Sequence, residues 1–160
     1  VLNRFHKLYV VKSISKSYGV PGFRLGVLAS SDTEMIDRIK KDVAIWNINS
    51  YGEFFMQILQ KYQKDYAAAL KRIKADRDIL IRGLKEIEGL RVFPSQANYV
   101  MCEVTTDKYT GRTLAERLLS EDIFIKDLTA KINNGRQYIR LAVRDTMDNN
   151  YLLSVLRKCM

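Results

Sequence analysis

A long stretch with helical spacing occupies the middle of the chain and constrains the fold more than any other sequence feature. Between Tyr51 and Glu88, apolar side chains recur three or four residues apart, which is the repeat of a helix that buries one face. A helix of this length is unusual in a small domain. We therefore expect it to connect two structural parts, with their boundary near residues 75–85 and any break near Asp76. The apolar positions are Phe55, Ile58, Leu59, Tyr62, Tyr66, Ala69, Leu70, Ile73, Ile79, Leu80, Leu84 and Ile87.

Two short apolar runs precede this helix. Residues 8–14 and 23–29 predict two strands, and the segment between them contains glycine and proline. A short helix should follow the second strand, with Ser31 and Glu34 as its capping-box pair. Two strands are too few for an independent sheet, so we expect their edges and an apolar face to remain open.

The pattern changes after Gly89 to short strands and helices. Their order is strand, strand, helix, strand, strand, helix, which predicts a compact α+β unit. We expect its first helix to be capped by Thr113 and Glu116, and its last helix to span residues 146–157. The predicted strands are residues 90–93, 97–104, 122–128 and 137–143.

The net charge of +9 would suit a nucleic acid if the basic side chains were clustered. The densest basic stretch, residues 61–88, also contains several acidic side chains. Such interspersed charge is typical of a solvated helix face. No zinc-finger or aromatic RNA-binding motif accompanies it. We therefore expect no nucleic-acid partner.

Soft metal ligands are scarce in the sequence. Cys102, Cys159 and the single histidine, His6, are too few for a structural zinc site, so we expect no metal. No apolar run reaches the length of a membrane span, and no signal-peptide pattern is present. We expect a cytoplasmic protein without a membrane partner. Because the chain lacks an initiator Met and its first strand begins almost at once, we also expect it to be part of a longer protein.

Chemistry-bearing side chains gather in the segment from Ser13 to Gly26, whose sequence is SISKSYGVPGFRLG. The hydroxyls of Ser13 and Ser15 can donate to phosphate oxygens, and Arg24 can bind a phosphate with two parallel hydrogen bonds. The glycines allow close approach of the backbone. The spacing fits neither a P-loop nor a dinucleotide fingerprint. The segment therefore predicts a site for a phosphorylated ligand.

Lys16 needs a role other than phosphate binding. It directly follows an apolar strand, where partial burial and the nearby Arg24 would both favour the neutral amine over the ammonium form. A neutral amine can attack a carbonyl carbon, as a Schiff-base lysine does.

The pattern S-x-S-K-x-x-G-x-x-G-x-R-x-G resembles the cofactor-lysine signature of fold type I, class I/II aminotransferases that use pyridoxal phosphate. Within that family it is similar to histidinol-phosphate aminotransferases and threonine-phosphate decarboxylases. The segments WNINS, PSQANYVMCEV and QYIRLAVRD extend the resemblance over the chain. It implies an α/β fold of which residues 1–50 are the end of the cofactor-binding large domain. Residues 51–88 would be the connecting helix, and residues 89–160 an α+β small domain.

The resemblance also implies the roles of four residues around the cofactor. Lys16 would form the Schiff base with pyridoxal 5'-phosphate and then move a proton at the substrate Cα. Ser13, Ser15 and Arg24 would hold the cofactor phosphate.

Two further residues would bind the substrate. The resemblance places the carboxylate-binding role on Arg140, although an ion pair with Asp127 or Asp145 remains an alternative for this side chain. Lys126 stands where histidinol-phosphate enzymes have an arginine that binds the substrate phosphate. Lysine attracts an anion but lacks the fork of donors that arginine offers, so the substrate is less certain than the class of reaction.

The implied function is transfer of an amino group between an amino acid or phosphorylated amine and a keto acid. The aspartate that pairs with the pyridine nitrogen in this family lies upstream of the cofactor lysine and is absent here. We therefore expect a C-terminal portion that is inactive alone and works with the rest of its parent polypeptide, as a homodimer. The alternatives are an amino-acid decarboxylase of the threonine-phosphate type and a non-catalytic assembly fragment.

Overall fold

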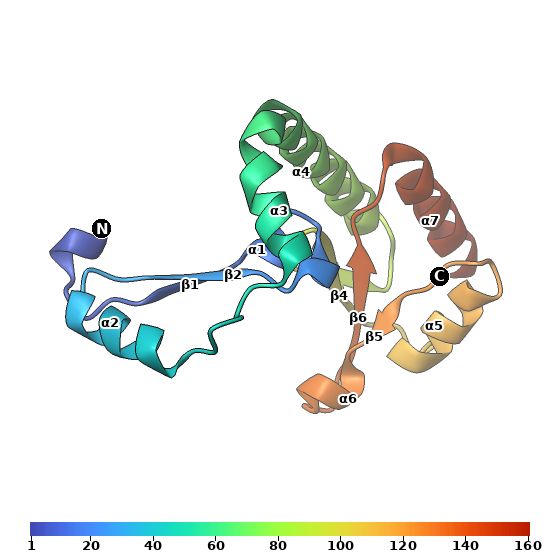
Figure 1. Ribbon diagram of the computed structural model, residues 1–160. Helices are drawn as coiled ribbons and strands as arrows, with labels where there is room; N and C mark the ends of the chain where they lie inside the picture. The colour runs from blue at the N-terminus through green and yellow to red at the C-terminus, as the bar shows by residue number, and fades with distance from the viewer. The chain divides into compact units, whose positions relative to one another are not determined.

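The chain divides into two structural units within helix α4 (Gln63–Lys85). The computed structural model describes all residues from Val1 to Met160, and the units are Val1–Ala67 and Ala68–Met160 (Figure 1). No helix of the chain is both long enough and apolar enough to cross a membrane.

The stretch predicted as one helix over 51–88 consists of three helical segments. These are α3 (Ser50–Ile58), the 3-10 turn η3 (Leu59–Tyr62) and α4. The break therefore lies at η3, and Asp76 falls within a continuous helix. The division between the units, at Ala67 and Ala68, also comes earlier than the expected residues 75–85.

An antiparallel ribbon dominates the first unit and is drawn in blue in Figure 1. Its strands are β1 (Val10–Ser13) and β2 (Gly26–Ala29), with Ser13 opposite Gly26. The connection between them contains α1 (Ile14–Ser17) and the 3-10 turn η2 (Pro21–Phe23). The two predicted strands are confirmed, although both are shorter than predicted, and they pair only with each other. Its exposed apolar side chains are Val10, Val11, Val27 and Leu28.

Helix α2 (Thr33–Asp42) follows the ribbon, and its cap differs from the prediction. The carboxylate of Asp32 accepts a hydrogen bond from the backbone N–H of Met35, so the predicted capping pair of Ser31 and Glu34 is wrong. Ser31 instead donates to the carbonyl of Leu2, in the 3-10 turn η1 (Leu2–Arg4). Both serine and aspartate suit an N-cap, and this long-range contact removes Ser31 from competition.

The second unit contains a four-stranded antiparallel sheet in the order β3-β4-β6-β5. The predicted order of strands and helices is confirmed, with one addition, the short helix α6. Strand β5 is far shorter than the predicted 122–128. The elements are β3 (Leu90–Val92), β4 (Tyr99–Val104), α5 (Gly111–Leu119), β5 (Lys126–Asp127), α6 (Thr129–Ile132), β6 (Gln137–Ala142) and α7 (Thr146–Cys159).

Helix α5 begins earlier than the sequence pattern suggests. Its N-cap is Thr110, whose hydroxyl accepts from the backbone N–H of Thr113 and whose backbone N–H donates to the hydroxyl of Thr113. The predicted cap by Thr113 and Glu116 is therefore wrong by three residues. Glu116 pairs with Arg112 on the helix surface instead.

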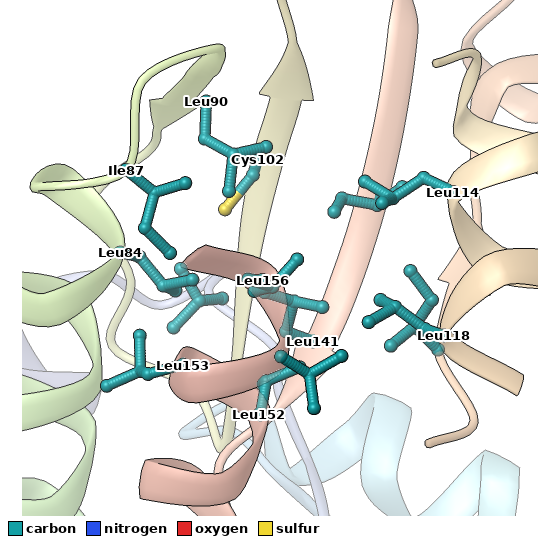
Figure 2. Packing of buried hydrophobic residues seen from close by; sticks show 14 of the residues in the cluster. Leu84, Ile87, Leu90, Cys102, Leu114, Leu118, Leu141, Leu152, Leu153 and Leu156 are labelled. Carbon is teal, nitrogen blue, oxygen red and sulfur yellow. The ribbon is translucent and has the colours of Figure 1, made fainter. Parts of the chain in front are cut away.

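The core of the second unit lies on one face of its sheet. Side chains from α4, α5 and α7 point toward strands β4 and β6 (Figure 2). Alternate residues of the central strands, such as Val100 and Cys102 on β4 and Ile139 and Leu141 on β6, are fully buried there. The opposite face carries the intervening residues of the same strands, which include Arg140.

Candidate functional site

The lysine turn, which consists of residues 13–18 and carries Lys16, is held by hydrogen bonds between Ser15 and Leu25, the residue directly before β2. The backbone N–H of Leu25 donates to Ser15 Oγ at 2.7 Å, and Ser15 Oγ lies 3.3 Å from the Leu25 carbonyl oxygen, to which it donates. The backbone N–H of Ser15 donates to the same carbonyl at 3.2 Å. Both residues are buried. The two ends of the motif are therefore joined at this pair.

Lys16 and Arg24 are brought together by this pairing. Lys16 follows Ser15 in the chain, and Arg24 precedes Leu25, so the two cationic residues flank one hydrogen-bonded pair. Both are exposed, and neither forms an ion pair within 4.0 Å. The backbone of Arg24 is left-handed, with φ of 54°, a conformation that costs energy for a residue with a Cβ. The expected partial burial of Lys16 is wrong for this chain.

The two predicted serine ligands differ in how their hydroxyls are used. Ser13 is half-buried and caps α1, where its Oγ accepts from the N–H of Lys16 at the long distance of 3.4 Å. Because this contact uses only a lone pair of the oxygen, the hydroxyl hydrogen of Ser13 remains free to donate. Ser15 differs from the expectation, because its hydroxyl is buried and directs its single hydrogen to Leu25.

Aromatic side chains support the lysine turn from the helical segments. The phenol of Tyr66 donates to the carbonyl of Ser17 at 2.9 Å, and its ring stacks on Tyr18 with 4.3 Å between centroids. Burial, together with the neighbouring Tyr18, raises the pKa of the Tyr66 phenol, so this group remains a neutral donor. The ring of Phe55 on α3 packs edge-on against Tyr18 and at a tilt against Phe23.

Asn49 is a supporting residue that sequence reasoning missed. Its Nδ2 donates to the carbonyl of Phe23 at 2.8 Å, and its Oδ1 accepts from the N–H of Gly52 and thereby caps α3. One side chain thus fastens the segment before Arg24 to the start of a helix. Asparagine immediately before a helical repeat is a cap signal, and that signal could have identified it.

Arg140 and Lys126, the predicted substrate-binding residues, are direct cross-strand partners in the second unit. They lie opposite each other on β6 and β5, and both are exposed. The guanidinium carbon of Arg140 lies 5.2 Å from the centroid of the Tyr99 ring on β4. Like charges placed directly opposite each other in a sheet repel, so this pair favours an anionic ligand.

The alternative ion pairs of Arg140 do not form. Asp127 accepts from the N–H of Thr129 at 2.9 Å, and Asp145 caps α7 by accepting from Asp148. Arg140 makes no ion pair within 4.0 Å. A structural carboxylate partner therefore does not explain this residue.

The buried carboxylate on the same face of the sheet is also engaged elsewhere. Glu103 forms ion pairs with Arg91 and, at 3.7 Å, with Arg136. On β4 it lies two residues from Met101, which is the cross-strand partner of Arg140. The charges of Lys126 and Arg140 are consequently left without a neutralising side chain.

Comparison with known proteins identifies the family. The model of the family described as aminotransferase class I and II matches residues 2–156. The chain belongs to this family. The expected fold class is confirmed as well, because the structure aligns with histidinol-phosphate aminotransferase from Clostridium acetobutylicum with a TM-score of 0.88 and 28% identity. That alignment covers 98% of this chain and 47% of the solved one.

Two curated relatives show the range of proteins that the chain resembles. The chain is 30% identical over 156 residues to CMP-5'-(3-aminopropyl)phosphonate synthase from Streptomyces rubellomurinus. This alignment covers 97% of the chain and 25% of that protein. It is 28% identical over 162 residues to L-serine phosphate decarboxylase from Sulfurospirillum multivorans, covering 100% of this chain and 41% of that protein. The chain thus spans well under half the length of these relatives.

Proposed function

We propose that the protein containing this chain is a pyridoxal-phosphate-dependent enzyme in which Lys16 binds the cofactor. The observation that carries the proposal is the Ser15–Leu25 pairing, because the residues next to it in the chain are Lys16, with an exposed amine, and Arg24, with an exposed guanidinium. The amine of Lys16 can attack an aldehyde carbon, and the guanidinium of Arg24 can bind a phosphate. Members of the aminotransferase class I and II family use this cofactor.

The side chains around Lys16 fit both the phosphate and the aldehyde of the cofactor. Arg24 would hold the phosphate with its fork of donors, and Ser13 would add its free hydroxyl hydrogen. When bound, the cofactor supplies an aldehyde and an electron-withdrawing ring. Lys16 would bind at that aldehyde carbon and afterwards take up or deliver a proton at the substrate Cα.

The cross-strand cations support a substrate that carries a phosphate or phosphonate group. Lys126 and Arg140 place two positive charges next to each other on β5 and β6, and no side chain neutralises them. Lys126 would pair with the phosphate, and Arg140, to which the resemblance assigns the substrate carboxylate, lies directly opposite it. The named relatives act on or form such compounds: histidinol phosphate, L-serine phosphate and an aminopropyl phosphonate. We therefore propose a phosphorylated amine or amino acid as the substrate.

Transamination is the reaction we propose first, since the matching family model describes aminotransferases. In that reaction Lys16 would remove the proton from the substrate Cα. The second candidate is decarboxylation, which the similarity to L-serine phosphate decarboxylase favours. There the carboxylate would leave from Cα, and Lys16 would deliver a proton to the same carbon.

The activity would belong to a longer polypeptide, with a homodimer as its assembly. The chain covers 25% and 41% of the two curated relatives and 47% of the solved structure. The ribbon of β1 and β2 exposes valine and leucine side chains that such a polypeptide could cover. By itself the chain would be a non-catalytic piece of that assembly.

The test uses the full-length protein that contains this chain. After incubation with pyridoxal phosphate and reduction with borohydride, mass spectrometry should locate the added mass on Lys16. Lys16→Ala should lose both the label and turnover, whereas Lys12→Ala, a change at an exposed lysine of β1, should retain both. Labelling that is unchanged in Lys16→Ala would contradict the proposal.

The same protein distinguishes the two reactions. O-phosphoserine, O-phosphothreonine and histidinol phosphate should each be offered with a keto-acid acceptor. Release of carbon dioxide without formation of a new amino acid from the acceptor identifies decarboxylation. Formation of the new amino acid identifies transamination.

A further inference from the structure

Ser15 is the most closely held residue of the lysine turn. Its backbone N–H and its Oγ contact Leu25 in three hydrogen bonds, and its carbonyl accepts from the N–H of Val20 at 2.8 Å. Only 4% of the residue is exposed. A buried hydroxyl that accepts from and donates to the backbone of one residue cannot also donate to a ligand, because it has a single hydrogen.

We propose that Ser15 is a positioning residue that fixes the distance between Lys16 and Arg24, and that it is not a ligand of the cofactor phosphate. Its hydroxyl joins the two strand ends of the motif at the residues directly adjacent to the two cations. If the cofactor is attached to Lys16 and its phosphate held by Arg24, the separation of these side chains decides whether both ends can be bound at once. The role therefore rests on the proposed function.

The neighbouring contacts show why one hydroxyl can matter so much. Arg24 has a left-handed backbone, which the surrounding structure must stabilise. The Ser15 hydroxyl holds the next residue, Leu25, by both its N–H and its carbonyl. Without this clamp, Arg24 could relax to an ordinary conformation and its guanidinium would move away from Lys16.

Ser15→Ala tests the clamp, and Ser17→Ala is the matched control in the same short helix, because the Ser17 hydroxyl makes no hydrogen bond in this structure. The first measurement needs no cofactor. In the full-length protein, amide hydrogen exchange at Leu25 should be slow in the wild type and in Ser17→Ala and faster in Ser15→Ala. Ser15→Thr, which keeps the hydroxyl, should restore slow exchange.

The second measurement uses the enzyme loaded with pyridoxal phosphate. Ser15→Ala should shift the pH midpoint of the cofactor's visible absorbance and lower kcat on the order of 10²-fold, as expected for a misplaced reacting group. KM should change little. Inhibition of cofactor uptake by inorganic phosphate should stay as in the wild type, whereas Ser13→Ala should alter it.

Three results would overturn the inference. Exchange at Leu25 that does not respond to Ser15→Ala would show that the hydroxyl clamps nothing. Weaker phosphate competition in Ser15→Ala, with an unchanged absorbance midpoint, would identify Ser15 as a phosphate ligand. If Leu25 responds as expected but no cofactor attaches to Lys16, the proposed function fails and the positioning role fails with it.

Discussion

Lys126 and Arg140 lie directly opposite each other at the edge of the second unit's sheet, one on β5 and one on β6. The two side chains are exposed and have no carboxylate partner on their face of the sheet, because Glu103 is held by Arg91 and Arg136. Such a pair weakens the sheet unless an anion binds to it. An unneutralised pair of cations in a strand of two residues is what a ligand-binding role would require.

Lys126→Glu should therefore change stability and function in opposite directions. Replacing the repulsive pair with an attractive one should raise the free energy of unfolding by about 0.2–1 kcal/mol, measured by urea denaturation of the chain. Turnover of a phosphorylated substrate by the full-length protein should fall sharply. Lys131→Glu makes the same change of charge on α6, where no cation lies opposite it in the sheet. This control should change neither the free energy of unfolding nor the turnover. A less stable Lys126→Glu chain would argue against charge repulsion at this position.

Asn49→Ala should loosen the segment that precedes Arg24. The substitution removes the cap of α3 and the hydrogen bond to the Phe23 carbonyl, and loss of a cap costs about 0.5–2 kcal/mol. We expect lower thermal stability together with weaker cofactor binding by the full-length protein. Asn47→Ala lies two residues away at an exposed position without such contacts and serves as the control. Equal effects of the two substitutions would mean that Asn49 supports nothing specific.

Cys102 should make the second unit sensitive to alkaline pH. Burial raises the pKa of its thiol from 9.0 to about 12, so above pH 9 the unfolded chain ionises before the folded one. The contribution of the neutral Cys102 thiol to the free energy of unfolding is therefore complete below pH 9, and it is lost as the pH rises toward 12. Cys102→Val removes this titration. Urea unfolding between pH 8 and 10 should show a smaller loss of stability for the variant, and parallel losses would contradict the assignment.

The second unit should fold without the first, because its buried cluster begins at Leu80 and draws every member from residues 80–160. A chain of residues 68–160 should unfold cooperatively in urea. Within it, Leu84→Ala should cost about 2–5 kcal/mol, as expected at a fully buried leucine. Met147→Ala, at a position that is 77% exposed on α7, should cost little. A broad, non-cooperative transition for the shortened chain would show that the first unit is needed.

The amino-acid sequence alone predicted the features that depend on neighbouring residues. The spacing of Ser13, Lys16 and Arg24 carried the resemblance to the aminotransferase family, which the family model confirms, and apolar repeats predicted the helices and the order of strands in the second unit. These signals are local, because a repeat or a motif is complete within a few turns of chain. The helix starts at Asp32 and Thr110 were missed, since several nearby residues suit a cap equally well.

Tertiary structure decided which distant residues meet. Nothing in the sequence shows that the Ser15 hydroxyl is used by Leu25, that Asn49 holds Phe23, or that Lys126 stands opposite Arg140. Pairing register follows from the packing of whole strands, and a shift of one residue would turn each side chain to the other face. For this reason the sequence could nominate Ser15, Lys16 and Arg24 as one candidate site, while only the fold could show that the two cations are exposed and that the serine hydroxyl is buried against Leu25.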